Sequence, residues 1–343
     1  MKIGIFSKLG ASGGSEFRAA EMANSLARAD HETYIFCENK INEKIKAVCI
    51  EKVQILEEIF KNNISLLYEM DSILVINTDS YNFSKLEYWE EKKVDLTKIK
   101  QLVVLYNFVL DPSKHLSTIK TKCPDVRIIT ANKHFFNEIS TQSRFNEIRH
   151  FPRIFLESPI DQNKVSSEKT KSNKIRIGRH SKSISYKFNK ETHSLIQRIN
   201  EKYKDQILWD FLGVDGDNAK ELDEIPNIII RKEFSVSVKE YLQNIDIFLF
   251  FIDWGRIEPW SRAVAEGMLS GCPILANNRG GNKDQILHGN NGFLCNSLDE
   301  FYGYLCYLIE NPDWIKKYGK NSIIYSREFT PDKILKKYLD FIK

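Results

Sequence analysis

Features typical of membrane-spanning, secreted and nucleic-acid-binding proteins are missing from this sequence of 343 residues. The most apolar run, Ile245 to Ile252, is far shorter than the roughly 20 residues that a membrane-spanning helix needs. The segment from Met1 to Phe6 lacks the apolar region of a signal peptide, and we expect it to form a strand. A net charge of +4 is too small to indicate a nucleic-acid partner. We therefore expect a cytoplasmic protein, either soluble or attached to the inner face of a membrane.

The cysteines lack any pattern of a disulfide framework or a metal site. The six cysteines form no C-x-x-C pair and show no Cys/His spacing that would hold a metal. Several lie in apolar runs, where a free thiol behaves as a small hydrophobic group. The sequence therefore predicts a reducing compartment.

One segment departs from the balanced charge of the rest. Between Lys98 and Arg153 there are ten lysines and arginines but only four acidic residues. A solvated surface would explain this surplus, and so would a patch that contacts anionic lipid or an acidic acceptor. Both interpretations stay open.

Apolar strands alternate with helical stretches along the chain, which predicts an α/β fold of two doubly wound, Rossmann-like domains. Residues 1–160 are expected to form the first domain and residues 174–330 the second. The polar segment 161–173 has no apolar periodicity and is expected to link them. An amphipathic helix over 331–343 is expected to pack back on the first domain.

Apolar periodicity places the elements within each domain. In the first domain, strands are predicted at residues 2–7, 33–37, 73–76, 102–105 and 127–130, with helices at 16–27 and 51–68. The second of these helices is predicted because Val53, Leu56, Ile59 and Phe60 would share one face. In the second domain, strands are predicted at 174–177, 207–212, 228–230 and 245–252, with helices at 190–203, 238–244, 301–309 and 312–318.

A glycine-containing loop follows the first predicted strand. Gly10, Gly13 and Gly14 form G-x-x-G-G rather than the dinucleotide fingerprint G-x-G-x-x-G. The loop leads into a helix N-terminus at the carboxyl edge of the sheet, a place that suits phosphate. Glu38 would fit the acid that binds ribose in an NAD-dependent oxidoreductase, which stays an alternative. A second alternative is that these glycines merely permit a tight turn.

The most informative stretch is Glu258-Pro259-Trp260-Ser261-Arg262-Ala263-Val264-Ala265-Glu266. We expect a helix here between two buried strands, with Pro259 in its first turn and Gly271 at the left-handed position after its end. Glu258 and Glu266 would then lie on one side of the helix, about 12 Å apart along its axis. A ligand that touches both would be elongated, with its anionic part near the helix N-terminus.

This stretch and its neighbours resemble the retaining family-4 glycosyltransferases of GT-B architecture. The resemblance rests on Glu258-x7-Glu266 within EPWSRAVAEGMLSGCPILANNRGG, on Asp284 and on the segment from Asn291 to Leu294. Further matches are Gly13-Gly14-Ser15-Glu16 with Arg18, and Ile177-Gly178-Arg179-His180-Ser181 with Lys187. The family implies two domains that face each other across a cleft, and a nucleotide-sugar donor bound mainly by the second.

The resemblance also implies roles for residues of the motif. Glu266 would hold the ribose hydroxyls of the donor, and Glu258 would contact hydroxyls of the transferred sugar. The backbone at Trp260, Ser261 and Arg262 would lie against the sugar and the diphosphate.

Positive charge for the diphosphate is expected from elsewhere in the chain. Arg179 and Lys187 would neutralise the leaving group, while backbone amides near Gly13 and Gly14 approach from the other domain. No divalent metal or other cofactor is then required. The triplet Asp215-Gly216-Asp217 looks like the D-x-D motif of metal-dependent glycosyltransferases, although turn chemistry explains it well enough.

The acceptor side is where the sequence departs from the family. Many members carry a histidine in a loop after a middle strand, but the loop here reads Tyr106-Asn107-Phe108-Val109-Leu110-Asp111. His115 and His134 are the nearby candidates for a base, and each would also fit as an ordinary surface or packing histidine. In the front-face mechanism proposed for the family, a donor phosphate oxygen takes the acceptor's proton, so activity does not require a histidine.

We therefore expect a retaining glycosyltransferase that moves a hexose from a UDP- or GDP-sugar to a glycan or a lipid-linked acceptor. Cell-surface polysaccharide or glycolipid synthesis is the expected setting, with peripheral membrane contact through the basic first domain. The main alternative is a non-catalytic homologue that binds nucleotide or glycan, and an NAD-dependent oxidoreductase comes third.

Overall fold

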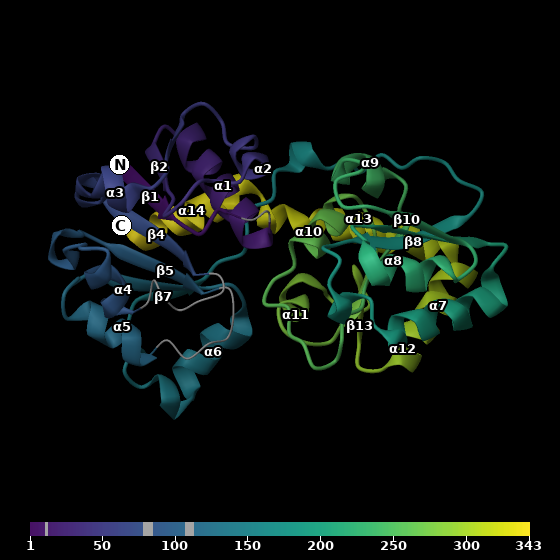
Figure 1. The fold of residues 1–343 in the computed structure, drawn as a ribbon. Coiled ribbons are helices and arrows are strands. Elements are labelled where there is room, and N and C mark those ends of the chain that lie inside the picture. Colours follow the sequence, from purple (N-terminus) through teal and green to yellow (C-terminus); the bar gives the residue numbers. More distant parts are fainter. Residues whose placement is uncertain (11–12, 78–84, 107–112) are drawn as a thin grey trace. The chain divides into compact units, whose positions relative to one another are not determined.

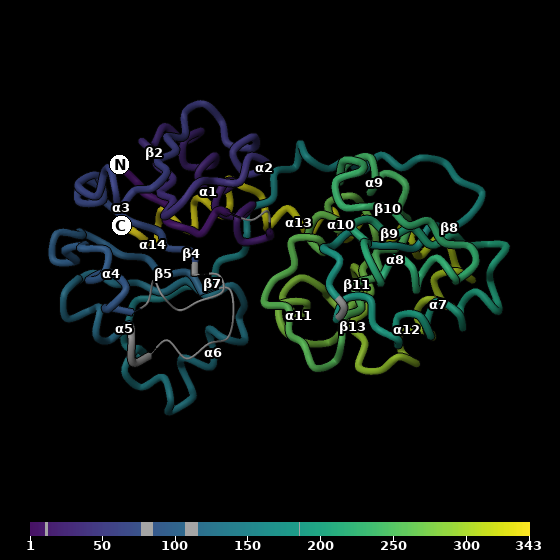
Figure 2. Tube along the Cα trace, viewed as in Figure 1, coloured from purple at the N-terminus to yellow at the C-terminus, as the bar shows by residue number. Residues whose placement is uncertain are grey.

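Contacts divide the chain into two units, drawn in the computed structural model of Figure 1. Unit 1 comprises Met1–Pro159 and Pro331–Lys343, and unit 2 comprises Ile160–Thr330. The structure describes residues 1–10, 13–77, 85–106 and 113–343, without the side chains of residues 77, 113–115 and 185. Both ends of the chain belong to unit 1 (Figure 2).

Unit 1 is built on a seven-stranded parallel sheet in the order β3-β2-β1-β4-β5-β6-β7. Its strands are β1 (Lys2–Phe6), β2 (Glu32–Phe36), β3 (Val53–Leu56), β4 (Ser72–Asn77), β5 (Leu102–Tyr106), β6 (Val126–Thr130) and β7 (Arg153–Phe155). Successive side chains enter two apolar cores, as Ile5 and Phe6 do. A parallel sheet buried on both faces has continuous apolar strands, which explains why most were recognisable in the sequence.

Helices of unit 1 pack on this sheet. They are α1 (Gly14–Arg28), α2 (Glu43–Lys46), α3 (Ile59–Asn62), α4 (Leu86–Glu91), α5 (Ser113–Lys120), α6 (Lys133–Thr141) and the C-terminal α14 (Pro331–Ile342). Helix α14 contacts α1, and its buried Ile334 and Tyr338 join the same core as Ala23 of α1. Lys337 of α14 also donates to both carboxylate oxygens of Glu157, at 3.2 and 3.1 Å.

The helix predicted over 51–68 is wrong. Residues Val53–Leu56 form β3 at the sheet edge, paired in parallel with β2, and only short helical turns follow, including the 3₁₀ segment Ile64–Glu69. Val53 and Ile55 contact one core whereas Leu56 contacts the other, as alternation along a strand requires. A sparse apolar pattern fits both the 3.6-residue period of a helix and the two-residue period of a strand. Pairing with β2 decides in favour of the strand.

Unit 2 contains a six-stranded parallel sheet in the order β10-β9-β8-β11-β12-β13. Its strands are β8 (Ile175–His180), β9 (Ile207–Leu212), β10 (Ile228–Arg231), β11 (Ile247–Phe250), β12 (Ile274–Asn277) and β13 (Gly292–Cys295). The strand order reverses between β8 and β11. In doubly wound sheets, ligands bind outside the carboxyl ends of the strands at such a switch point.

Helices of unit 2 connect these strands. They are α7 (Lys190–Tyr203), α8 (Gly216–Asp223), α9 (Val238–Gln243), α10 (Arg262–Leu269), α11 (Asn282–Gln285), α12 (Leu298–Glu310) and α13 (Pro312–Ser326). None of the helices in the described part of the chain is both long and apolar enough to cross a membrane.

Helix α10 starts later than its sequence predicts. Ser261 is the N-cap, and its hydroxyl oxygen accepts a hydrogen bond from the Val264 amide at 3.3 Å. Pro259 therefore precedes the helix, and Glu258 lies in the loop before it, so the two glutamates do not share a helix face. The predicted end is confirmed, because Gly271 follows the helix with φ of +75°.

The segment predicted as a linker is attached to unit 2. The Lys169 ammonium donates to the carbonyl oxygens of Leu242 and Ile245 at 2.9 and 2.6 Å. The Thr170 amide donates to the Gln243 carbonyl at 2.9 Å. These bonds hold the segment along the end of α9 and the approach to β11.

Gly178 brings β8 against β9 at the centre of unit 2. A Cβ atom at this position would lie 1.7 Å from the Asp210 carbonyl oxygen and 2.7 Å from the Tyr241 hydroxyl. The backbone around Asp210 belongs to the neighbouring strand and cannot move without breaking the ladder. Any side chain at Gly178 must therefore separate two central strands.

We expect Gly178→Ala to lower the free energy of unfolding by about 3 kcal/mol, because overpacking forces the strands apart. Gly303→Ala is the matched control, since a Cβ there meets nothing within 4 Å in helix α12. That substitution should raise stability by roughly 1 kcal/mol through helix propensity. Urea unfolding measures both changes, and a Gly178→Ala variant as stable as the wild type would contradict the close approach.

Candidate functional site

Side chains predicted to bind the donor in the second domain gather at the switch point of unit 2. Arg179 lies at the carboxyl end of β8, and Lys187 ends the 3₁₀ turn Ser185–Lys187 that follows. Glu258 comes from the loop after β11, and its carboxylate raises the pKa of both cations. The segment that follows β8 thus supplies two cations, and the loop after β11 supplies the carboxylate beside them.

Arg179 is the most buried cation of this cluster, with 1% of its surface exposed. Its Nη1 donates to the carbonyl oxygen of Phe251, and the guanidinium lies 4.3 Å from the centre of the Phe188 ring. Its Nε and Nη2 are buried and have no acceptor among the described residues. A buried donor without an acceptor is costly, so these two nitrogens favour an anionic oxygen in front of them.

Lys187 adds a second positive charge beside Arg179. Burial lowers the pKa of its ammonium group, Glu258 raises it, and the nearby Arg179 and Lys182 lower it further. An ammonium held near a guanidinium in partly buried surroundings gains from any polyvalent anion that both contact. The pair is therefore suited to an anion, and its contact with the donor diphosphate stays a prediction.

Glu266 of α10 is a buried carboxylate held from two sides. Its Oε1 lies 2.8 Å from Nε of Arg262, and its Oε2 lies 3.2 Å from Nε2 of His180. Burial by itself raises the pKa of Glu266, but Arg262 and His180 together lower it to about 2. The group is therefore ionised and acts only as a hydrogen-bond acceptor at neutral pH. His180 belongs to the predicted match from Ile177 to Ser181, but the sequence-based prediction gave it no role.

The loop that carries Glu258 is held by residues that the sequence did not single out. The Gly281 amide donates to the Glu258 carbonyl at 2.9 Å, and a Cβ at Gly281 would lie 1.9 Å from the Pro259 carbonyl oxygen. Gly280 has φ of +56°, and a Cβ there would lie 2.4 Å from the Glu258 carbonyl oxygen. The glycine pair after β12 thus lets the two loops pack backbone to backbone.

Gln285 closes the same arrangement at Ser261. Its buried amide accepts from the Ser261 N–H at 3.0 Å and donates to the Ser261 carbonyl at 2.8 Å. Trp260 is 9% exposed and packs edge to face on Phe329, 5.5 Å between ring centres. The side chain of Trp260 is thus committed to packing, which leaves its backbone for the predicted contact.

Gly13 and Gly14 begin helix α1 in unit 1. Gly13 is the N-cap with extended backbone and carries no side chain that could cap the first amides. This is the helix N-terminus predicted from the loop, and its contact with a donor stays a prediction. Arg18, which belongs to the same motif, is structural: its Nη2 donates to the carbonyl oxygens of Leu156 and Glu157 at 2.6 and 3.2 Å.

Glu38, the candidate ribose acid of an oxidoreductase, has protein partners instead. Its carboxylate pairs with the Lys92 ammonium at 2.8 Å and accepts from the Tyr88 hydroxyl at 3.2 Å. These contacts give Glu38 a place in the packing of α4 against the sheet. They favour a structural role over a dinucleotide site.

Of the two histidines suggested as a base, the structure describes the side chain of His134 alone. His134 has a side chain that is 63% exposed on α6, where it pairs with Glu138 at 3.6 Å. His115 lies in α5, but its side chain falls outside the described part of the structure, as do residues 107–112 of the predicted acceptor loop. A base on the acceptor side stays a prediction.

Two other features of unit 2 lie outside this cluster. Asp215 precedes α8 as its N-cap residue, followed by Gly216 with φ of +60°, so a turn into a helix explains the D-G-D triplet.

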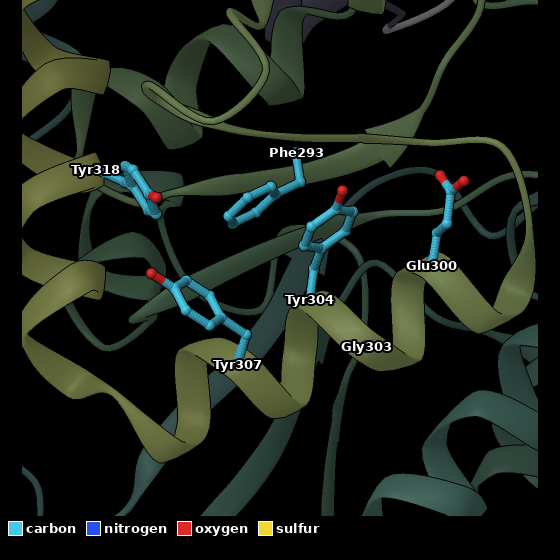
Figure 3. A pocket seen from close by; sticks show the side chains of 6 residues that line it. All are labelled: Phe293, Glu300, Gly303, Tyr304, Tyr307 and Tyr318. Carbon is cyan, nitrogen blue, oxygen red and sulfur yellow. The ribbon is translucent and has the colours of Figure 1, made fainter.

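A surface hollow of about 400 Å³ lies over β13, α12 and α13 (Figure 3). Its wall includes the stacked rings of Phe293 and Tyr304, 4.1 Å apart. The hollow shares no residue with the predicted donor site.

Residues 189–325 match the family model described as Glycosyl transferases group 1. The chain is 25% identical over 260 residues to the alpha-1,3/1,6-mannosyltransferase ALG2 of Dictyostelium discoideum. That match covers 63% of this chain and 59% of the mannosyltransferase, so the chain spans about three fifths of this relative's length. The predicted resemblance is confirmed at the level of the group 1 domain, and membership of family 4 stays a prediction.

Solved structures share the fold over nearly the whole chain. Anabaena Alr3699/HepE in complex with UDP has a TM-score of 0.75 at 15% identity, covering 99% of each chain. A glycosyltransferase from Rickettsia africae ESF-5 has a TM-score of 0.75 at 16% identity, covering 100% of this chain and 97% of its own. These likenesses confirm the predicted α/β fold of GT-B architecture.

The affinity of the Arg179–Lys187 pair for a nucleoside diphosphate should fall at alkaline pH. Burial lowers the pKa of both Arg179 and Lys187. Lys187 therefore loses its proton, and with it its attraction for phosphate, at lower pH than an exposed lysine, whereas the Arg179 guanidinium keeps its charge. Calorimetric titration between pH 7.5 and 10 should show affinity highest at the lower end and declining toward pH 10.

Lys187→Arg is the control for this decline, because arginine keeps its charge to higher pH. The variant should retain more affinity at pH 10 than the wild type does. Equal affinities at pH 7.5 and pH 10 in the wild type would show that the Lys187 ammonium does not hold the diphosphate.

Proposed function

We propose that this protein is a retaining glycosyltransferase that moves a hexose from a UDP- or GDP-sugar to a glycan or lipid-linked acceptor. The observation that carries the proposal is the buried Arg179 guanidinium, two of whose nitrogens have no acceptor among the described residues. It lies at the switch point of a Rossmann-like sheet, where a nucleotide is expected. The group 1 domain match over residues 189–325 supports sugar transfer.

The nucleotide part of the donor follows from the charges around Arg179. The diphosphate would lie against Arg179 and Lys187, and the ribose hydroxyls would donate to the ionised Glu266. Glu258 would accept from hydroxyls of the transferred sugar, because its loop places it beside both cations. Backbone groups at Trp260, Ser261 and Arg262 would border the sugar and diphosphate.

In the proposed reaction, the acceptor hydroxyl oxygen forms a bond to the anomeric carbon as the bond from that carbon to the diphosphate oxygen breaks. The acceptor's proton passes to a phosphate oxygen of the departing nucleoside diphosphate. Attack from the face that the leaving group vacates retains the anomeric configuration. The residues supply charge and orientation: Arg179 and Lys187 stabilise the negative charge that grows on the leaving diphosphate. This role of fixed cations is why we propose a reaction without a divalent metal.

The solved neighbours favour a uridine nucleotide among the possible donors. Anabaena HepE is described in complex with UDP and with UDP-glucose, the latter with a TM-score of 0.73 to this chain. The curated relative from Dictyostelium is described as a mannosyltransferase, which favours a hexose. A UDP-hexose is therefore the first donor to test, with a GDP-hexose second.

The basic segment of unit 1 supports an acceptor at a membrane surface. Lys133 lies in α6, Arg144 in the 3₁₀ turn Ser143–Phe145 that follows it, Arg149 beyond that turn, and Arg153 at the start of β7. Such a surplus suits anionic lipid headgroups or an acidic glycan. We propose a lipid-linked or surface-polysaccharide acceptor reached from the cytoplasmic side.

A donor panel tests the proposal directly. Thermal unfolding is measured with UDP-, GDP-, ADP- and dTDP-sugars, because a ligand bound only to the folded state raises the midpoint. At least one donor should raise it and be hydrolysed slowly without acceptor, which a non-catalytic homologue would not do. If no donor is bound or hydrolysed, the proposed function fails. Binding of NADH instead would favour the oxidoreductase alternative.

Arg179→Lys should weaken donor binding by on the order of tenfold, because a point charge replaces the fork of N–H donors. Arg198→Lys is the matched control: this arginine is half-exposed on α7, where it pairs with Asp299 at 2.9 Å. Titration calorimetry with the donor selected from the panel measures both. An unchanged affinity in Arg179→Lys would remove the diphosphate from its proposed place.

A further inference from the structure

His180 is a partly buried polar residue of the site that the proposed reaction does not use. It ends β8 directly after Arg179, and its side chain is 12% exposed. Its Nε2 faces Oε2 of Glu266 at 3.2 Å, while Nε of Arg262 faces the other oxygen at 2.8 Å. The carboxylate therefore has one fixed neighbour on each oxygen, and only one of the two comes from its own helix.

Packing fixes the orientation of the His180 ring. The ring meets Phe248 of β11 edge to face at 5.7 Å and Tyr241 of α9 at 6.2 Å. Tyr241 is itself held, because its hydroxyl donates to the Asp210 carbonyl at 2.5 Å. A Cβ at Gly267 would lie 2.9 Å from the Phe248 ring, so α10 is packed tightly on the same aromatic group. The imidazole thus has a defined place between the sheet and the helix that carries Glu266.

A carboxylate that binds a ribose must present both oxygens in one plane to two neighbouring hydroxyls. The terminal torsion of glutamate is broad, so a single contact from Arg262 leaves the plane free to turn. A second contact on the other oxygen removes that freedom. Each oxygen has two lone pairs, which leaves one for the ribose after the protein contact is made.

We infer that His180 is a positioning residue that orients Glu266 for the ribose diol and so sets the preference for ribonucleotides over deoxyribonucleotides. It acts through Glu266 by the approach of its Nε2 to Oε2 at 3.2 Å, which is close but lacks the alignment of a hydrogen bond. It touches neither the sugar nor the reacting atoms. The inference rests on the proposed function, since it concerns the nucleotide of that same donor. It assigns the specificity for ribose to a contact between β8 and α10.

The test compares ribo- and 2′-deoxyribonucleotides in matched variants. Calorimetry measures the affinities of UDP and 2′-deoxy-UDP, or of GDP and 2′-deoxy-GDP if the guanine nucleotide binds more tightly. The wild type should prefer the ribonucleotide by on the order of tenfold, as expected for a hydrogen bond to a charged group. His180→Leu should lose most of that preference by weakening ribonucleotide binding while deoxyribonucleotide binding changes little.

His180→Gln should restore much of the preference, because its amide N–H can donate to the same oxygen. In a Glu266→Ala background, His180→Leu should have no further effect on the preference, because the two residues act as one unit. When the nucleotide-sugar donor is the varied substrate, His180→Leu should raise the KM for that donor and leave kcat nearly unchanged. The reason is that the ribose is remote from the bond that breaks. His193→Leu is the control, a histidine of α7 that faces Glu221 at 3.7 Å outside the site.

Two results would overturn the inference. One is an equal loss of ribo- and deoxyribonucleotide affinity in His180→Leu, which would show a general structural role. The other is an undiminished ribose preference in that variant. A wild-type protein that binds none of the four nucleotides would instead overturn the proposed function, so the two failures are distinguishable.

Discussion

The site in unit 2 depends on one constraint, the burial of the Arg179 guanidinium. Two of its nitrogens lack acceptors among the described residues. Burial of a charge without compensating hydrogen bonds is unfavourable, and here it is tolerated at the switch point of a parallel sheet. Arg179 has its position because β8 lies between β9 and β11 and because Gly178 lets β9 approach closely. The same geometry that packs the sheet therefore holds a positive charge toward a place suited to an anion.

The negative charges of the site are held by a second set of contacts. Backbone packing of Gly280 and Gly281 against the loop of Glu258 fixes that loop, and Gln285 fixes its end at Ser261. Glu266 has its own partners on both oxygens. Neutral neighbours thus fix the loop of Glu258, whereas Arg262 and His180 face the two oxygens of Glu266.

Unit 1 uses comparable means for a structural purpose. Arg18 bonds to two backbone carbonyls at the end of β7, and Lys337 of α14 pairs with Glu157 there. These contacts hold the C-terminal helix against the first sheet. The two buried arginines therefore differ: Arg18 joins two segments of unit 1, whereas Nε and Nη2 of Arg179 have no acceptor among the described residues.

Most strands and the long helices could be predicted from the sequence alone, because parallel strands buried on both faces form continuous apolar runs. The order of motifs, with Arg179, Glu258 and Glu266 as candidates, was also evident from local residue patterns.

Local patterns failed at Val53–Leu56, where pairing with β2 makes a strand of residues with helical spacing. They failed again at Pro259, because Ser261 caps the helix and leaves Glu258 in a loop. Only the tertiary structure decided three contacts of the site. His180 meets Glu266, and Gly281 and Gln285 meet the loop before α10. Each joins residues 20 or more positions apart, and no local periodicity records which distant residues will meet.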